Sequence, residues 1–222
     1  MEYGAAFLES VRAETERVWA DPYLGLGWQP GTRWRGPMTD ADVAQAEERY
    51  ALHFPPDYRL FLQTLHTTDP ERVSYVDGTI HSHVGRPFHD WQADRSPIDE
   101  AVAWPLDGLL WSIEADESWS SSWGDRPPTP GERAEKVRAL AAAGPPLIPV
   151  MGHRYLVGEP LEVGNPVLSI YGSDVIVYAP SFGAWLVAEL AQMVDPVLRA
   201  LAPVVEGDVR ATPFWQNVID GT

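Results

Sequence analysis

The segment from Thr39 to Leu65 constrains the fold most, because it encodes two short helices separated by a Pro-Pro corner. Thr39 is a good N-cap residue, and Asp42 follows three residues later, as in a capping box with Asp in place of Glu. Pro55 is expected to stop the first helix. Pro56 or Asp57 can open the second helix, since a fixed φ or a carboxylate suits the first turn. This segment therefore predicts a compact pair of helices joined by a stiff corner.

Both helices have one apolar face. In the first, the apolar residues recur at helical spacing, at Val43, Ala46 and Tyr50. In the second, they fall at i, i+3, i+4 and i+7: Tyr58, Phe61, Leu62 and Leu65. The two helices should therefore pack on a common core.

The remaining pattern predicts an α+β protein with helices grouped around one antiparallel sheet of about five or six strands. The expected helices are Ala5–Trp19, Glu132–Ala143, one capped by Ser181, one opened by Asp195-Pro196, and a short one near Phe214–Ile219. The expected strands are Val73–Tyr75, Thr79–Val84, Leu109–Glu114, Leu147–Met151, Arg154–Val157, Val167–Tyr171 and Asp174–Tyr178. Asp77-Gly78 suits the turn of one hairpin and Gly172-Ser173 a type II′ turn in another.

The order of these elements resembles the signature of the SUKH superfamily, the Smi/Knr-type domains. That signature has an acidic capped helix with an A-x-E-E-R-like run, a Leu/Phe-Pro-Pro-Asp-Tyr corner and an aromatic-leucine helix. The matching segments here are Ala46–Arg49, Phe54–Tyr58 and Leu60–Leu62. Later segments look like the family's hydrophobic-Ile-Pro strand, closing hairpin and last helix: Leu147–Val150, Gly164–Ala179 and Ser181–Leu186.

The resemblance implies a SUKH-like domain over residues 38–190 with an expanded middle. An N-terminal helix and loop would occupy 1–37, and a helical extension packed on the domain would occupy 191–222. It further implies a non-catalytic protein-binding module. Many bacterial members are immunity proteins that neutralise a cognate polymorphic toxin, often one that attacks nucleic acid, and fungal relatives are regulatory adaptors. The family has no shared catalytic residues to carry over.

Charge and composition limit the classes of molecule that this chain is expected to bind. The formal net charge is −16, from 16 basic and 32 acidic residues, which disfavours nucleic acid and anionic membranes and would attract a basic protein. The alternative interpretation is that the negative charge only keeps the protein soluble and does not select a partner. The chain has no cysteine, no apolar run long enough to cross a bilayer and no signal-like start at Met1, so we expect a cytoplasmic protein.

An acidic loop with two tryptophans is the first candidate for the partner-binding face. Its residues are Glu114, Asp116, Glu117, Trp119, Trp123 and Asp125. Aromatic anchors with a charged rim are typical of protein interfaces. The alternative is that both rings fold back onto the sheet.

Histidines give a second candidate segment. His81 and His83 lie on one face of an expected strand, and His89, Asp90 and Trp91 follow. A histidine pair can bind zinc, but no third ligand has diagnostic spacing, so a surface pair is the simpler interpretation. His153-Arg154-Tyr155 could act as a general base or anion clamp, or pack as a structural triplet.

We therefore expect no catalysis, no cofactor and no metal. The predicted mechanism is steric and electrostatic blockade of a basic toxin by an acidic, aromatic face of a monomer or weak homodimer. A regulatory adaptor without a toxin partner is the alternative, and a metal-dependent enzyme using His81 and His83 is a further one.

Overall fold

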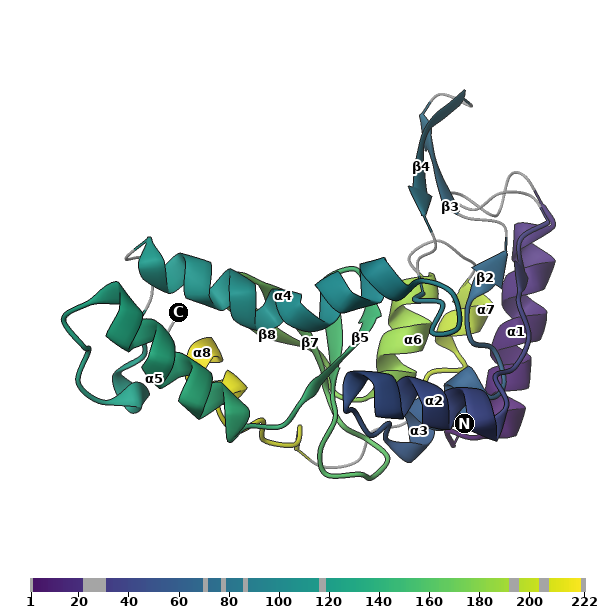
Figure 1. Ribbon diagram of the computed structural model, residues 1–222. Coiled ribbons are helices and arrows are strands. Elements are labelled where there is room, and N and C mark those ends of the chain that lie inside the picture. The colour runs from purple at the N-terminus through teal and green to yellow at the C-terminus, as the bar shows by residue number, and fades with distance from the viewer. Residues whose placement is uncertain are drawn as a thin grey trace.

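The computed structural model describes residues 2–21, 31–69, 72–76, 79–85, 88–115, 119–191, 196–203 and 208–220 (Figure 1). For 72–76, 79–85, Pro196 and Leu198 the description covers the backbone only. Over these residues the chain is a mixed α/β protein with antiparallel sheets.

A four-stranded antiparallel sheet forms the centre of the fold. Its strands, in the order β5-β6-β7-β8, are β5 (Leu147–Met151), β6 (Arg154–Val157), β7 (Val167–Tyr171) and β8 (Asp174–Ala179). β7 and β8 pair from Val167↔Ala179 to Tyr171↔Asp174 around Gly172, whose φ of 63° suits the first central position of a type II′ turn. Pro149 is tolerated because β5 is an edge strand. The four strands predicted for this half of the chain are confirmed.

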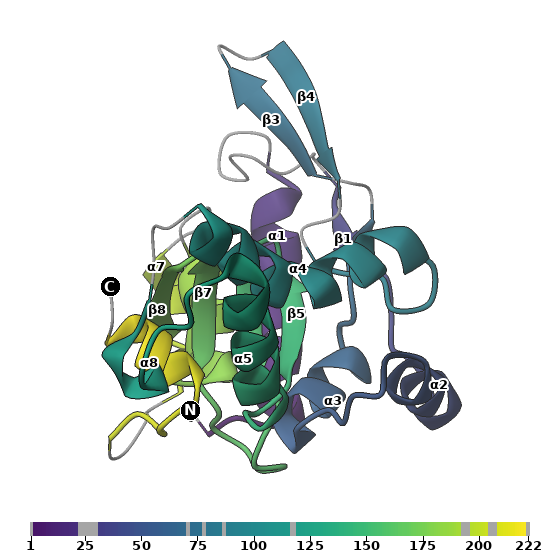
Figure 2. The ribbon, with the colours of Figure 1, turned by 60° about the vertical axis from the view of Figure 1, so that its left-hand side comes forward.

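Both faces of this sheet are buried, so the protein has two cores. Ile148, Leu156 and Val167 face one core, which includes the aromatic residues of the N-terminal half and α6 (Phe182–Ala191). Leu168, Ile170 and Val175 face the other, which α5 (Pro130–Ala142) and α8 (Trp215–Ile219) help to close (Figure 2). Alternating strand residues thus serve different cores.

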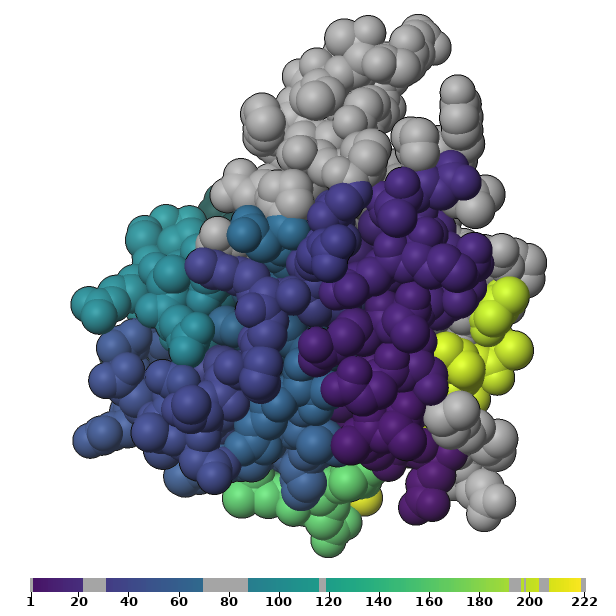
Figure 3. Space-filling view, turned by 90° about the vertical axis from the view of Figure 1, so that its right-hand side faces the viewer, coloured from purple at the N-terminus to yellow at the C-terminus, as the bar shows by residue number. Residues whose placement is uncertain are grey.

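The N-terminal half is held by aromatic rings. One side of the molecule carries α1 (Ala5–Trp19), α2 (Asp40–Tyr50) and α3 (Pro56–Leu62) (Figure 3). Trp34 follows Arg33 in β1 (Arg33–Trp34), which pairs with β2 (Thr68–Asp69). The Trp34 ring packs on Trp19, Phe61 and Phe88 at centroid distances of 5.6, 5.9 and 5.1 Å. Such contacts add to the free energy from apolar burial.

The helix pair forms as predicted at its start. The Thr39 hydroxyl accepts from the Asp42 N–H at 3.2 Å, and the Asp42 carboxylate accepts from the Thr39 N–H at 2.9 Å. The expected stop at Pro55 is wrong, because α2 ends at Tyr50 and Ala51 takes a left-handed conformation with φ 50°. Pro56 begins α3 as expected. Leu65 lies beyond α3 but is fully buried.

The predicted strand Leu109–Glu114 is wrong, since these residues end the 20-residue helix α4 (Arg95–Glu114). A strand would place Leu109, Trp111 and Ile113 on one face. In the helix Leu109 and Ile113 are buried, while Trp111 turns away to solvent. The prediction of one sheet with five or six strands fails with it. The described chain has the four-stranded sheet and two separate ribbons, β1–β2 and β3 (Arg72–Val76) with β4 (Thr79–Gly85).

The closing helices follow the prediction. Ser181 Oγ accepts from the Ala184 N–H at 3.2 Å at the start of α6. Pro196 begins α7 (Pro196–Arg199), and α8 carries the buried Trp215 and Val218. These segments therefore complete both cores.

Pro105 inside α4 is compensated by a tertiary hydrogen bond. Proline has no N–H, so the Ala101 carbonyl four residues earlier loses its partner within the helix. The Tyr155 hydroxyl, from the central strand β6, donates to that carbonyl at 3.0 Å. The same bond ties the middle of α4 to the sheet.

Tyr155→Phe should lower the free energy of unfolding by about 1–2 kcal/mol, because it leaves a carbonyl unsatisfied while keeping the packed ring. In the Pro105→Ala background, Tyr155→Phe should lower the free energy of unfolding by less, since an alanine at position 105 restores an N–H that can donate to the Ala101 carbonyl. Urea unfolding of the four proteins in this cycle measures the coupling, and the exposed Tyr171→Phe is the matched control. An equal cost in both backgrounds would disprove the compensation.

Candidate functional site

The acidic loop does not present both of its tryptophans to solvent. Trp123 is only 4% exposed in the 3₁₀ turn Ser121–Trp123, stacked on Phe214 with centroids 6.0 Å apart. Trp119 is half-buried, donates its Nε1–H to the Gly124 carbonyl at 3.0 Å and packs edge-on against Trp123. The prediction that Trp123 is an exposed anchor is therefore wrong. Its ring closes the core of the sheet face that α5 covers.

The carboxylates of this loop do not form one described cluster. Glu114, at the end of α4, and Asp125, after the 3₁₀ turn, are exposed. Asp116 and Glu117 lie outside the described residues. The loop is thus supported by buried tryptophan packing, and it keeps exposed charges at its two ends.

The second candidate segment, from His81 to Trp91, also has some residues whose side chains are not described and others that are buried. His81 and His83 are in β4, and their side chains lie outside the description. His89 is half-buried, whereas Asp90 and Trp91 are buried. The prediction that Asp90 and Trp91 offer a partner-binding face is wrong, because both serve the interior.

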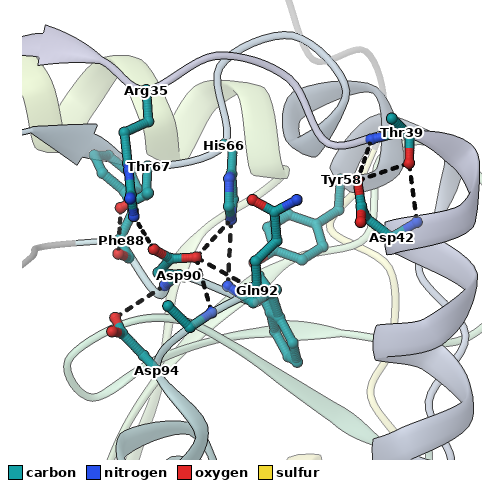
Figure 4. Close-up of polar contacts among 12 residues, drawn as sticks. Arg35, Thr39, Asp42, Tyr58, His66, Thr67, Phe88, Asp90, Gln92 and Asp94 are labelled. Carbon is teal, nitrogen blue, oxygen red and sulfur yellow. Dashed lines mark hydrogen bonds and ion pairs between the residues drawn. The ribbon is translucent and has the colours of Figure 1, made fainter.

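Asp90 is the centre of a buried polar network (Figure 4). Its carboxylate pairs with the Arg35 guanidinium and accepts the backbone N–H groups of Gln92 and Ala93, each at 3.1 Å. His66 Nε2 lies 3.6 Å from Asp90 Oδ1 and accepts the Trp91 N–H at 3.2 Å. Three chain segments therefore meet on one carboxylate, which would be costly to bury without these partners.

Trp91 extends this network into the helix pair. Its indole Nε1–H donates to the Tyr58 hydroxyl at 2.8 Å, and its ring packs on Phe54 with centroids 4.9 Å apart. The Pro-Pro corner is thereby joined to the turn before α4. These are structural contacts that the sequence does not reveal.

Burial lowers the pKa of two histidines in this region. The pKa of His89 falls to about 4, and that of His66 is lowered despite the opposing charge of Asp90. His89 Nε2 is buried with no hydrogen-bond partner among the described residues. Both rings are therefore neutral at pH 7, in agreement with the Trp91 N–H donated to His66.

When a histidine has a lower pKa in the folded state than in the unfolded state, its full contribution to the free energy of unfolding is present above the unfolded pKa, about 6.5. That contribution is lost as the pH falls from this value toward the folded pKa, because the unfolded state binds the proton first. Between pH 6.5 and about 4, His89 should contribute a slope of up to about 1.4 kcal/mol per pH unit. His89→Gln should flatten the dependence of unfolding free energy on pH in this window. Denaturant unfolding at several pH values measures it, and exposed His53→Gln is the control. Identical profiles for wild type and His89→Gln would contradict this account.

A large aromatic groove lies between α4 and the β7–β8 turn. It has a volume of about 610 Å³ and is lined by Trp104, Asp107, Gly108, Trp111, Ser112, Tyr171, Gly172, Ser173 and Asp174. Trp104, Trp111 and Tyr171 are 41%, 66% and 70% exposed. Three large aromatic side chains gathered at one recess are unusual on a protein surface that has no partner.

The groove exists because α4 lies close to the hairpin turn (Figures 1 and 2). A Cβ on Gly172 would meet Ser112 Oγ at 2.8 Å, and one on Gly108 would lie 3.4 Å from the Gly172 backbone. With two glycines facing each other, the helix and turn come into contact, and the larger side chains on either side form the walls. Trp104 and Tyr171 lie across this contact with ring centroids 6.0 Å apart.

A smaller recess of about 330 Å³ adjoins the groove through Trp104 and Tyr171 and includes Glu100 and His153. Burial and then the charge of Arg154 lower the pKa of His153, while Asp174 opposes them. His153 is therefore neutral at pH 7. The charged groups that line the two recesses among the described residues are carboxylates: Glu100, Asp107 and Asp174.

Sequence reasoning missed this groove because it assigned Trp111 to a strand. Trp104, Gly108 and Trp111 are spaced i, i+4 and i+7, which places them on one side of a helix. That helical spacing was the available signal. The meeting of this side with Tyr171 and Asp174 depends on tertiary packing.

Comparison of the chain with protein-family models, curated proteins and solved structures gives no match. Among the described residues, no group of three or more histidine, aspartate or glutamate side chains could hold a metal ion. Of the helices described, none has the length and apolar character that crossing a bilayer requires.

Proposed function

We propose that this chain is a SUKH-like, non-catalytic binding module that acts as an immunity protein, neutralising a basic toxin domain. The observation that carries the proposal is the groove, where Trp104, Trp111 and Tyr171 are exposed beside Asp107 and Asp174. Interfaces concentrate binding free energy in such aromatic anchors surrounded by polar groups. This face replaces the acidic loop as the preferred docking surface.

The resemblance to SUKH domains is supported by how the Pro-Pro corner packs. Asp57 is buried, and its carboxylate accepts the N–H groups of Tyr58 and Gly164 at 3.0 and 3.1 Å. The corner is thereby joined to the segment before β7. These two parts of the chain are among those that carry the resemblance, so the motif residues belong to one structural unit.

The charge of the chain supports the choice of partner. A net charge of −16 attracts a basic protein and increases the rate of encounter. A toxin that grips phosphate groups needs a basic surface. An acidic protein docked there would block substrate by occupying the same surface, without any catalytic group of its own.

The test is a calorimetric titration against a candidate basic toxin domain chosen from the genes next to the one that encodes this chain, at about 50 and 300 mM salt. We expect one-to-one binding with nanomolar Kd that weakens at the higher salt concentration. Trp111→Ala should weaken binding by about 10- to 100-fold, because it removes an exposed anchor. Leu161→Ala, which removes an exposed apolar side chain in the loop between β6 and β7, outside the groove, is the control and should bind like wild type.

Absence of binding at micromolar concentrations would reject this toxin pairing and favour the adaptor alternative. Tight binding that Trp111→Ala leaves unchanged would retain the immunity function and reject the groove as its site.

A further inference from the structure

The aromatic faces in the groove are available to a ligand. Trp104 extends from α4 and Tyr171 from the end of β7, and their rings are inclined at 55°. Trp111, two turns along α4 from Trp104, lines the same recess. All three rings are exposed to solvent. They are not packed into either of the two apolar cores that cover the faces of the sheet.

Elsewhere this protein places its own cations on aromatic rings. The Arg154 guanidinium lies 3.8 Å from the centroid of Tyr178, and Lys136 Nζ lies 5.6 Å from that of Trp119. Contacts of this kind are attractive, because a cation interacts favourably with the electron-rich face of an aromatic ring. By contrast, no lysine or arginine among the described residues lines the groove or the adjoining recess. Among the described residues, therefore, no cationic side chain packs on the aromatic rings of the groove.

The carboxylates of the groove also have no cationic partner among the residues that the structure describes. Asp107 and Asp174 are exposed, and neither forms an ion pair with a described residue. His153 is the nearest titratable base of the adjoining recess, and it is neutral at pH 7. Carboxylates beside aromatic faces favour a cation over an apolar or anionic ligand.

We propose that the groove binds an arginine side chain of the partner protein, with its guanidinium against the faces of Trp104, Trp111 and Tyr171 and near the carboxylates of Asp107 and Asp174. Arginine fits better than lysine, because a planar guanidinium stacks on aromatic rings and pairs with carboxylates through several N–H groups. A volume of about 610 Å³ is sufficient for one such side chain. The inference rests on the proposed function, since it names the chemistry of the partner at that same site.

The probe is the peptide acetyl-Gly-Arg-Gly-amide, compared with peptides that carry citrulline or leucine in place of arginine. Citrulline keeps the shape of arginine and removes its charge. Binding to the full chain is followed by ¹H-¹⁵N spectra of the indole groups, with the Trp104 and Trp111 signals assigned from Trp→Phe variants. We expect the arginine peptide to shift these two signals with a millimolar Kd and the citrulline peptide to bind at least about 5-fold more weakly.

Charge variants separate the local effect from the net charge. Asp107→Asn with Asp174→Asn should weaken the arginine peptide at least about 5-fold and leave the citrulline peptide unchanged. The control, Glu48→Gln with Asp125→Asn, changes the net charge equally at exposed positions outside the groove and should have little effect. Loss of affinity in both double variants would assign the effect to net charge and overturn the proposal.

Three other outcomes overturn the inference: equal binding of the arginine and citrulline peptides, stronger binding of the leucine peptide, and indole shifts that depend on protein concentration alone. The last would show that a second copy of the chain occupies the groove. The toxin titration is judged separately. If the toxin binds and Trp111→Ala weakens that binding, but the peptides show no preference for arginine, the proposed function is retained and only the arginine inference fails. If the groove prefers the arginine peptide but the toxin does not bind, the groove chemistry is retained and the toxin pairing is rejected.

Discussion

Burial of both faces of the β5–β8 sheet is the constraint on which the rest of the structure depends. Each face needs its own apolar cover, and residues from distant parts of the chain supply it. Helix α4 is long enough to serve both, with Ile98 in one core and Leu109 and Ile113 in the other. Its path across the end of the β7–β8 hairpin follows from this double role.

The groove is a consequence of that path. A helix that contributes to two cores has only part of its circumference left for solvent, and Trp104, Asp107 and Trp111 occupy this part beside the hairpin turn. The contact at Gly108 and Gly172 brings Tyr171 and Asp174 to the same place. A binding surface built on a helix and a tight turn is stiffer than one on a long loop, and stiffness lowers the entropic cost of binding.

Tryptophan has two uses in this protein, and sequence patterns separate them poorly. Trp91 and Trp123 occur in polar, acidic stretches typical of an exposed face, yet both are buried by rings that lie far away in the sequence. Trp111 lies in a largely apolar run, Leu109–Ile113, typical of a core strand, yet it is exposed. Local polarity misleads here because the packing partners, Phe54 and Phe214, come from other segments.

The sequence by itself determined the elements whose signals are local. These include the capped start of α2, the proline start of α3, the four strands β5–β8 and the hairpin turn at Gly172, because caps, proline and strand periodicity act over a few residues. Tertiary structure decided the rest. It placed Asp90 in a buried network, satisfied the carbonyl freed by Pro105 and brought the three aromatic residues to one groove, since each depends on contacts between segments that the sequence does not bring together.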